Sequence, residues 1–283
     1  MRQPIVAGQF YESEFTKLNK QIENAFENGP GSLPLEKRDK NILASIVPHA
    51  GYPYSAKCAA WAYKEIAESK FPEVFIILGV AHSGVDNVVI SSQDWSTPFG
   101  TIKVDKDACR RLECDFIKVD ESSHEQEHSI EVQLPFLQFI SKNNLDRLKI
   151  LPILINSLDI NLIKKVADKI YSLKKPFIIL ASSDFIHYGY NYGYKPFKFN
   201  IQEEVKNLEE QFYSLISELE TEKFIELIEK TRATICGASA IAVLLELAKK
   251  FQIKGRLLCN YSSSDINSDN ENFVDYASFI FKK

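Results

Sequence analysis

The stretch KPFIILASSDFIHYG, residues 175–189, carries both the main signal for the fold and the first signal for a functional site. Its apolar run, residues 176–183, shows no alternation with polar residues, which is typical of a strand buried on both faces of a sheet. The run ends with Asp184, and His187 follows three residues later. A turn needs only glycine, asparagine or aspartate. The aspartate and histidine together therefore indicate chemistry at the end of this strand.

Comparable apolar runs occur three more times, at NILASIV (41–47), EVFIILGV (73–80) and KILPILI (149–155), and segments with helical spacing separate them. Buried strands that alternate with helices predict a mostly parallel sheet covered by helices on both faces. We therefore expect an α/β fold: a single three-layer α/β/α domain over residues 1–283. The last two runs, 256–263 and 273–281, are adjacent in sequence and are expected to pair antiparallel at one edge.

The remaining element predictions are more local. Residues 88–92 and 101–104 are expected to form a short hairpin. Residues 128–141 have helical spacing, and Pro135 within them is expected to kink the helix. The other expected helices are 56–70, 160–173, one near 200–230 and one at 237–251.

Composition and charge exclude several classes of protein. The net charge of −4 and the isoelectric point near 5.8 provide no basic field for nucleic acid. No apolar stretch reaches the roughly 18 residues that span a bilayer, and the N-terminal residues lack the apolar core of a signal peptide. The five cysteines form no CxxC pair, which favours reduced thiols. We therefore expect a cytoplasmic protein that binds neither nucleic acid nor membranes.

Three of the five histidines occupy equivalent positions in the expected fold. His49, His82 and His187 each lie just after the C-terminal end of a predicted buried strand. In a parallel sheet these ends share one edge, where α/β proteins build their binding sites. A single histidine there would most simply be a loop or core residue, but three of them favour a shared site.

Converging imidazoles usually hold a metal ion. Cys236 is the best-placed thiol for a further ligand, because it lies at the start of an apolar helix, where the helix dipole favours thiolate; a buried structural cysteine is the alternative. Asp184 has two interpretations. It either orients His187, which would then act as a general base or supported ligand, or it caps the turn after the strand.

The segment HEQEH, His124 to His128, matches the HExxH pattern of zinc peptidases. The preceding residues are polar and no further histidine follows at the spacing of that class, so a zinc hydrolase is a minor alternative. His128 and Glu131 lie three residues apart and are expected to contact substrate from one helical face, unless they form a surface ion pair. Tyr54 and Tyr188 flank the histidines and are expected to line the same pocket.

Six ordered blocks of sequence together resemble the Memo-like family, whose archaeal and bacterial members are often labelled AmmeMemoRadiSam system protein B. They are RQPIVAGQFY (2–11), PHAGYPYS (48–55), GVAH (79–82), EHSIEVQLPFL (127–137), SSDFIHYG (182–189) and CGAS (236–239). The family is similar in fold to the LigB-like class III extradiol dioxygenases, which hold non-haem Fe(II) with two histidines and a carboxylate.

The resemblance implies roles for individual residues. His49 and His82 match the two histidine ligands, and His187 matches the acid/base histidine, with Asp184 beside it. Cys236 falls where the dioxygenases carry a glutamate ligand. The family's site is implied to bind iron or copper, with redox activity. A thiolate is softer than a carboxylate and oxidisable, so ring-cleaving activity does not follow from the fold.

The sequence therefore predicts a metal-dependent oxidoreductase with one transition-metal ion, iron(II) or copper, zinc being the third choice. His49, His82 and Cys236 are the expected ligands, and His187 with Asp184 the expected proton-transfer pair. The rival hypothesis is a non-catalytic module whose vestigial pocket binds a peptide or phosphopeptide, since animal relatives bind phosphotyrosine-containing receptor peptides. The expected partner is accordingly a small molecule or a peptide.

Overall fold

The computed structural model describes residues 1–86 and 88–282. Its strands are β1 (Ile42–Val47), β2 (Val74–Gly79), β3 (Val88–Ile90), β4 (Trp95–Thr97), β5 (Gly100–Val104), β6 (Ile117–Val119), β7 (Lys149–Leu154), β8 (Phe177–Ser182), β9 (His187–Tyr188), β10 (Gly255–Ser262) and β11 (Phe273–Lys282). Its α-helices are α1 (Phe15–Asn28), α2 (Tyr52–Ala67), α3 (Lys106–Leu112), α4 (Ser122–Glu125), α5 (Leu134–Ile140), α6 (Ile160–Tyr171), α7 (Ile201–Ser217), α8 (Thr221–Thr231), α9 (Ala238–Phe251) and α10 (Ser264–Asn267). Two 3₁₀ helices are η1 (Glu131–Gln133) and η2 (Tyr190–Tyr192).

The strands form one open, mixed sheet in the order β10-β11-β1-β8-β2-β7-β3-β6. Its centre is parallel: β1 pairs with β8, β8 with β2, and β2 with β7. Every residue of β1, β2 and β8 is buried, as their predominantly apolar sequences predict. At one edge β10 and β11 pair antiparallel, and β11 also pairs antiparallel with β1. The predicted α/β fold and its antiparallel edge are therefore confirmed.

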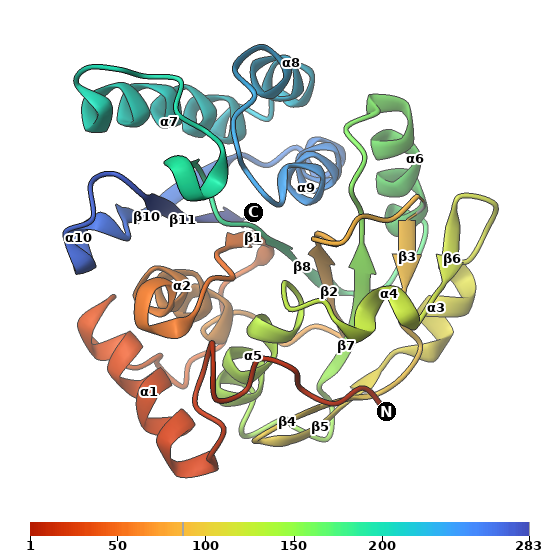
Figure 1. The fold of residues 1–283 in the computed structure, drawn as a ribbon. Helices are drawn as coiled ribbons and strands as arrows, with labels where there is room; N and C mark the ends of the chain where they lie inside the picture. The colour runs from red at the N-terminus through yellow and green to blue at the C-terminus, as the bar shows by residue number, and fades with distance from the viewer. Residues whose placement is uncertain (87, 283) are drawn as a thin grey trace.

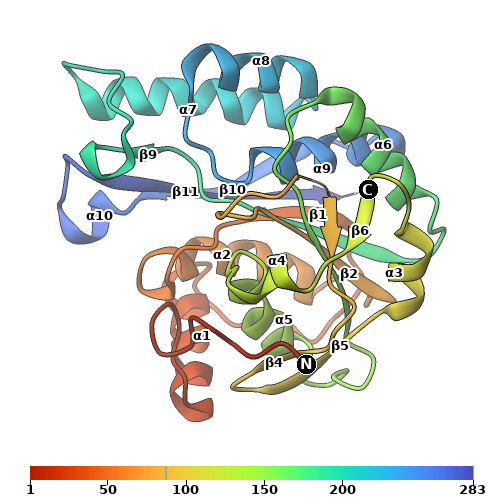
Figure 2. The same cartoon turned by 45° about the vertical axis from the view of Figure 1, so that its right-hand side comes forward.

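Helices cover the sheet in two layers (Figures 1 and 2). Helices α1, α2 and α5 pack together on one face, and α6, α8 and α9 pack together on the other. Helix α6 buries Ile163, Val166, Ala167 and Ile170, which the helical repeat places on one side. Helix α9 is buried from Ala238 to Leu247 on all sides because it lies between the sheet and its neighbouring helices.

Three local predictions were wrong. The hairpin forms between β4 and β5, whereas β3 joins the main sheet beside β7 and β6. The helix expected over 128–141 is shorter, because η1 precedes α5 and Pro135 stands in the first turn of α5, where its missing N–H costs no hydrogen bond. The single helix expected near 200–230 is divided into α7 and α8.

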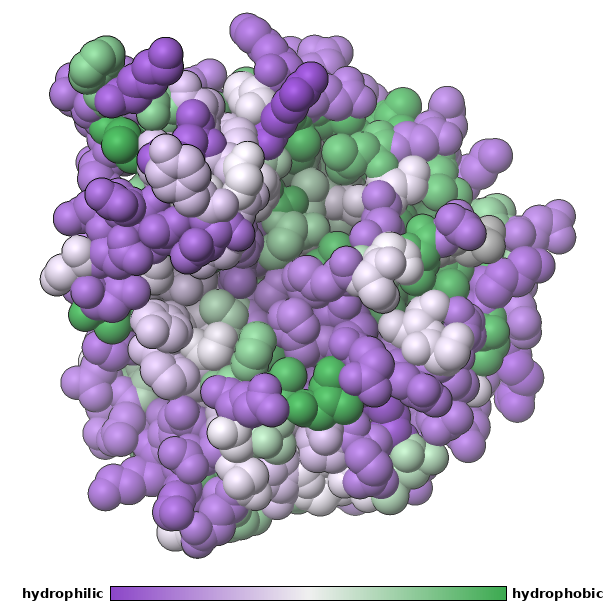
Figure 3. Space-filling view, viewed as in Figure 1, coloured by the Kyte–Doolittle hydropathy of each residue, from purple (hydrophilic) through white to green (hydrophobic). Residues whose placement is uncertain are grey.

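The parallel register aligns the strand ends that matter for function. Val47 is opposite Ser182, and Leu78 is opposite Ala181, so β1, β8 and β2 end at nearly the same level. Hydrophilic residues cover most of the molecular face shown in Figure 3. Within the described residues, no helix combines the length and the hydrophobicity needed to cross a membrane.

Candidate metal centre

His49 follows β1 and is almost completely buried. Its Nδ1 lies 3.0 Å from the Ser182 Oγ. The Ser182 hydroxyl donates to the Ser129 carbonyl at 2.6 Å and accepts from the Gln133 Nε2 at 2.8 Å. Because that hydroxyl proton is already used, His49 Nδ1 must donate, which leaves Nε2 unprotonated. Burial, followed by the nearby His82, lowers the pKa of His49 to about 3, so the ring is neutral and suited to bind a metal.

His82 follows β2 and is held by Glu127. The Glu127 carboxylate accepts from the backbone N–H of His82 at 2.7 Å and lies 3.1 Å from its Nδ1. Burial alone would lower the pKa of His82, but the hydrogen bond and charge of Glu127 outweigh it and raise that pKa. The same contacts overcome burial at Glu127 and lower its pKa to about 2. Glu127 therefore orients the ring so that Nε2 points away from the carboxylate.

His128 belongs to the same cluster of imidazoles. Its ring stacks on His82 with centroids 4.5 Å apart and lies 5.6 Å from the His49 ring, edge to face. The Phe10 ring also contacts it edge to face, with ring centroids 4.8 Å apart. Burial and the neighbouring histidines lower the pKa of His128 to about 4. The structure thus places this predicted substrate-binding residue beside the expected ligands.

Cys236 reaches the site from the turn before α9. Its Sγ lies 3.1 Å from the His49 Nε2 and accepts from the Asp184 N–H at 3.2 Å. Gly237 permits this close approach, because a Cβ there would lie 2.4 Å from the Ser182 carbonyl oxygen. Desolvation and the Asp184 charge raise the pKa of the Cys236 thiol. Desolvation at this position therefore opposes the effect of the helix start, which favours thiolate.

The potential ligand atoms of the described residues form two groups that share His49, each with its atoms within 4.8 Å of one another. One group adds His82 and His128, and the other adds Asp184 and Cys236. The structure therefore brings all three expected ligands, His49, His82 and Cys236, to one edge of the sheet. It divides them between two neighbouring groups, however, with His49 at the centre.

His187 has partners other than the expected one. Its Nδ1 lies 2.9 Å from the carbonyl oxygens of Phe185 and Thr234, and since a carbonyl only accepts, Nδ1 carries the proton and Nε2 is the basic nitrogen. The Asp184 Oδ1 instead accepts from the backbone N–H groups of His49 and Ala50 at 2.8 and 3.3 Å. Two backbone carbonyls, rather than Asp184, thus orient the imidazole. Asp184 holds the loop that presents His49.

Two of the predicted pocket residues lie in the interior. Tyr188 is fully buried, stacks on Phe273 and donates to the Phe197 carbonyl. Glu131 is also fully buried: its carboxylate pairs with Arg2 and accepts from the backbone of Ile5 and Val6 and from the Tyr11 hydroxyl. Both residues were expected to contact substrate. Tyr188 instead packs in the core, and Glu131 instead forms a buried ion pair. Tyr54 remains exposed on α2, and its carbonyl accepts from the Tyr261 hydroxyl.

The HExxH pattern does not form one helical face. Helix α4 ends at Glu125, so His124 and His128 are not on the same helix. His124 is fully buried, lies edge to face on Trp95 at 5.8 Å and has no well-formed hydrogen bond from its ring to any described residue. It belongs to neither ligand group of the described residues. The zinc-hydrolase alternative therefore lacks its geometric basis.

His124 makes the protein sensitive to acid. Burial lowers its pKa from 6.5 to about 4, so the unfolded chain binds a proton there more readily than the folded protein. The contribution of neutral His124 to the free energy of unfolding is constant above pH 6.5. About 3 kcal/mol of it is lost as the pH falls from 6.5 to 4. Leucine has a similar volume and does not bind a proton. We therefore expect the free energy of unfolding of His124→Leu to fall by about 3 kcal/mol less than that of the wild type between pH 6.5 and pH 4. Denaturant unfolding at both pH values measures the difference, and equal losses in the two proteins would contradict it.

No sequence pattern identified several of the residues that contact the histidines. Glu127, Ser182, Gln133 and Thr234 hold the histidines through hydrogen bonds between distant segments. Tyr192 in η2 lies edge to face on His187 with ring centroids 5.2 Å apart. The adjacency of Glu127 to His128 within the EHSIEVQ block was the only available indication, and it did not reveal that Glu127 binds His82.

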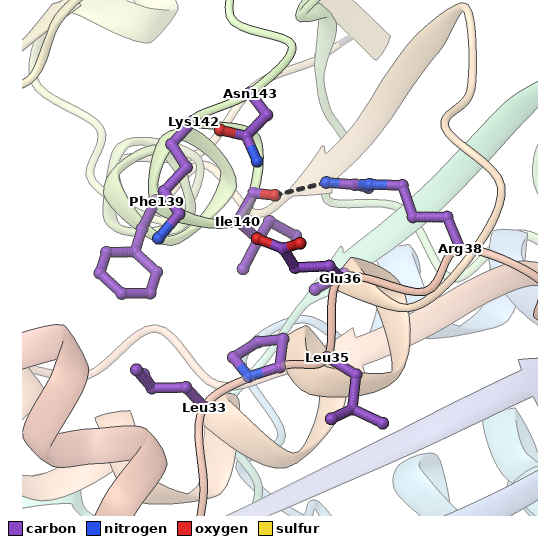
Figure 4. A pocket seen from close by; sticks show the side chains of 10 residues that line it. Leu33, Leu35, Glu36, Arg38, Phe139, Ile140, Lys142 and Asn143 are labelled. Carbon is purple, nitrogen blue, oxygen red and sulfur yellow. Dashed lines mark hydrogen bonds between the residues drawn. The ribbon is translucent and has the colours of Figure 1, made fainter.

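A separate pocket of about 280 Å³ lies between the loop after α1 and the end of α5 (Figure 4). Arg38 lines one side of it and donates to the Ile140 carbonyl at 2.8 Å. Figure 4 shows Leu33 and Phe139 facing the same space from these two elements. None of the predicted site residues lines this pocket.

Comparison with known proteins identifies the family of this chain. A family model described as Memo-like protein matches residues 2–280. MEMO1 family proteins of Saccharolobus islandicus and Saccharolobus solfataricus are each 37% identical over 294 residues, covering 99% of both chains. A MEMO1 family protein of Pyrococcus furiosus is 33% identical over 295 residues, covering all of this chain and 99% of the relative. The protein therefore belongs to the Memo-like family.

Proposed function

We propose that this protein binds a redox-active transition metal, iron(II) or copper, at the His49 cluster and acts as a metal-dependent oxidoreductase. One observation carries the proposal. His49 Nε2, left free by the Ser182 hydrogen bond, lies 3.1 Å from Cys236 Sγ and belongs to a group of imidazoles with His82 and His128. Nitrogen and sulfur donors that converge on a buried point are the usual setting of a transition metal.

The donor geometry fits such an ion. With metal–nitrogen and metal–sulfur bonds of about 2.1 and 2.3 Å, a tetrahedral ion separates the two ligand atoms by about 3.5 Å. The observed 3.1 Å between His49 Nε2 and Cys236 Sγ needs only a small adjustment. The second nitrogen of His49 and of His82 is held by Ser182 and Glu127, the arrangement that metal-binding histidines generally show.

The protein's own groups provide binding, access and proton transfer. His49 and Asp184 form a buried floor, whereas the His82 side chain is 41% exposed and His128 22% exposed. A small molecule can therefore approach from the solvent side. His187, with its proton fixed on Nδ1 by two carbonyls, presents Nε2 as the proton acceptor. A bound iron or copper ion would supply the redox chemistry that these side chains lack, whereas zinc would not.

Metal content tests this proposal. We expect protein purified anaerobically and loaded with Fe(II) or Cu(I) to retain one equivalent by mass spectrometry. His49→Ala and Cys236→Ser each remove a ligand and should lower metal affinity by about 10- to 100-fold or more. Cys109→Ser is the matched control, because Cys109 is a buried thiol elsewhere, bonded to the Ser91 carbonyl.

Oxygen uptake with catechol-like substrates then separates catalysis from binding. Uptake by the loaded wild type, lost in His49→Ala, supports oxidoreduction. Stoichiometric metal without uptake of oxygen would favour the non-catalytic module that binds a small molecule or peptide. Absence of stoichiometric metal from the wild type, or metal retained in both ligand variants, would overturn the site itself.

A further inference from the structure

A second polar pocket, of about 440 Å³, lies between α7 and the outer strands β10 and β11, with α10 at its rim. Figure 1 shows these elements together, away from the β2 and β7 end of the sheet. None of the residues assigned above to the metal centre lines this pocket. It is therefore a separate place on the molecule.

Two buried carboxyl groups form the floor of this acidic pocket. Glu209 of α7 and Asp275 of β11 are each only 5% exposed. Glu209 Oε2 accepts from the Tyr213 hydroxyl at 2.9 Å, whereas Oε1 makes no well-formed hydrogen bond to a described residue and the Glu209 and Asp275 carboxyl groups face each other closely. The strongest charge interaction of Glu209 is with Asp275, and that of Asp275 is with Asp265. The largest charge interactions of both groups are therefore with other carboxyl groups.

The rest of the pocket adds further oxygen donors. The Ser262 hydroxyl bonds to Asp275, and Asp265 is fixed at the rim because its Oδ2 accepts from the Ser262 N–H at 2.9 Å. Glu203 and Asn260 also line the pocket, where Lys206 is the lining residue with a positive charge. Four carboxyl groups and one lysine side chain therefore line the pocket.

We propose that this acidic pocket binds a hard divalent cation of the calcium type, with Glu209 and Asp275 as its central ligands. A buried carboxylate without a partner is strongly disfavoured, and a cation between the two would satisfy the free Glu209 oxygen. The available donors are carboxylate, hydroxyl and amide oxygens, the set that Ca²⁺ prefers, and the open rim leaves room for coordinating water. This donor set contains no sulfur or imidazole, in contrast to the His49 cluster.

Calorimetric titration with CaCl₂ tests the proposal on the full-length protein after treatment with a chelating resin. We expect one Ca²⁺ per chain in the wild type and a melting temperature that rises with calcium concentration. Glu209→Gln and Asp275→Asn keep side-chain size, and each should weaken binding about 10- to 100-fold or more. Glu246→Gln is the matched control, because Glu246 is a buried helical glutamate paired with Lys249 outside this pocket.

His49→Ala separates this site from the transition-metal centre, since it should leave calcium binding unchanged. Circular dichroism of each variant verifies the fold before titration. No saturable calcium binding by the wild type would overturn the proposal and leave a proton shared between the two carboxyl groups. Binding that persists in both Glu209→Gln and Asp275→Asn would overturn it equally, because the ion would then be held elsewhere.

Discussion

Replacing Arg2 with methionine is expected to lower the free energy of unfolding by about 3–5 kcal/mol. The Arg2 guanidinium is buried, pairs with Glu131, lies 4.2 Å from the centre of the Trp95 ring and donates to the carbonyls of His124 and Glu127. Methionine preserves much of the packing but leaves the Glu131 charge buried without its cation. A loss of this size is a large part of the roughly 5–15 kcal/mol that stabilises a typical domain.

A double-mutant cycle separates the ion pair from packing. Glu131→Gln removes the charge, so the Arg2→Met/Glu131→Gln protein should be more stable than the sum of the single losses predicts. Denaturant unfolding of the four proteins gives the coupling energy. A loss below about 1 kcal/mol for Arg2→Met, the range of an exposed pair, would show that water reaches Glu131.

Replacing Glu127 with glutamine is expected to weaken metal binding by about 10- to 100-fold. The Glu127 carboxylate orients His82 and also accepts from the Ser129 N–H at 2.6 Å. Glutamine retains one acceptor oxygen, so the loop should keep its fold. The amide has no charge and presents an NH₂ group towards His82 Nδ1, which opposes the tautomer that leaves Nε2 free.

The pKa of His82 provides a readout that does not depend on metal. Glu127 raises this pKa, so Glu127→Gln should lower it in an NMR titration, where five histidines give a tractable spectrum. Glu125→Gln is the matched control, because Glu125 is an exposed carboxylate two residues away. An unchanged His82 pKa together with unchanged metal affinity would show that Glu127 does not position the ring.

The central sheet was predictable because a strand that is buried on both faces requires consecutive apolar residues, which are visible in the sequence. Each of β1, β2, β7 and β8 appears as a predominantly apolar run, since a buried polar side chain must replace its hydration with a hydrogen bond, as Ser45 and Ser182 do. Short elements were less predictable: β3 and β5 read as a hairpin but pair with other strands. In strands of three to five residues, neighbouring strands decide the pairing, and local pattern contains little information about them.

The sequence indicated which residues of the candidate site lie together, but not the contacts that hold them. His49, His82, Asp184 and His187 lie at aligned strand ends, a consequence of parallel order that sequence can indicate. The partner of His82 lies 45 positions away and that of His49 lies 133 positions away. Hydrogen bonds over such separations depend on how loops pack, and no local pattern specifies them.

The sequence by itself determined the fold class, the family and the edge of the sheet where the histidines gather, because hydrophobic burial and strand order repeat along the chain. Only the tertiary structure decided which way the neighbouring side chains face. It turned Tyr188 and Glu131 into the interior, brought Glu127 to His82, and paired Glu209 with Asp275. The physical reason is that burial is a property of one residue in its element, whereas a polar contact depends on two segments whose meeting the whole fold must specify.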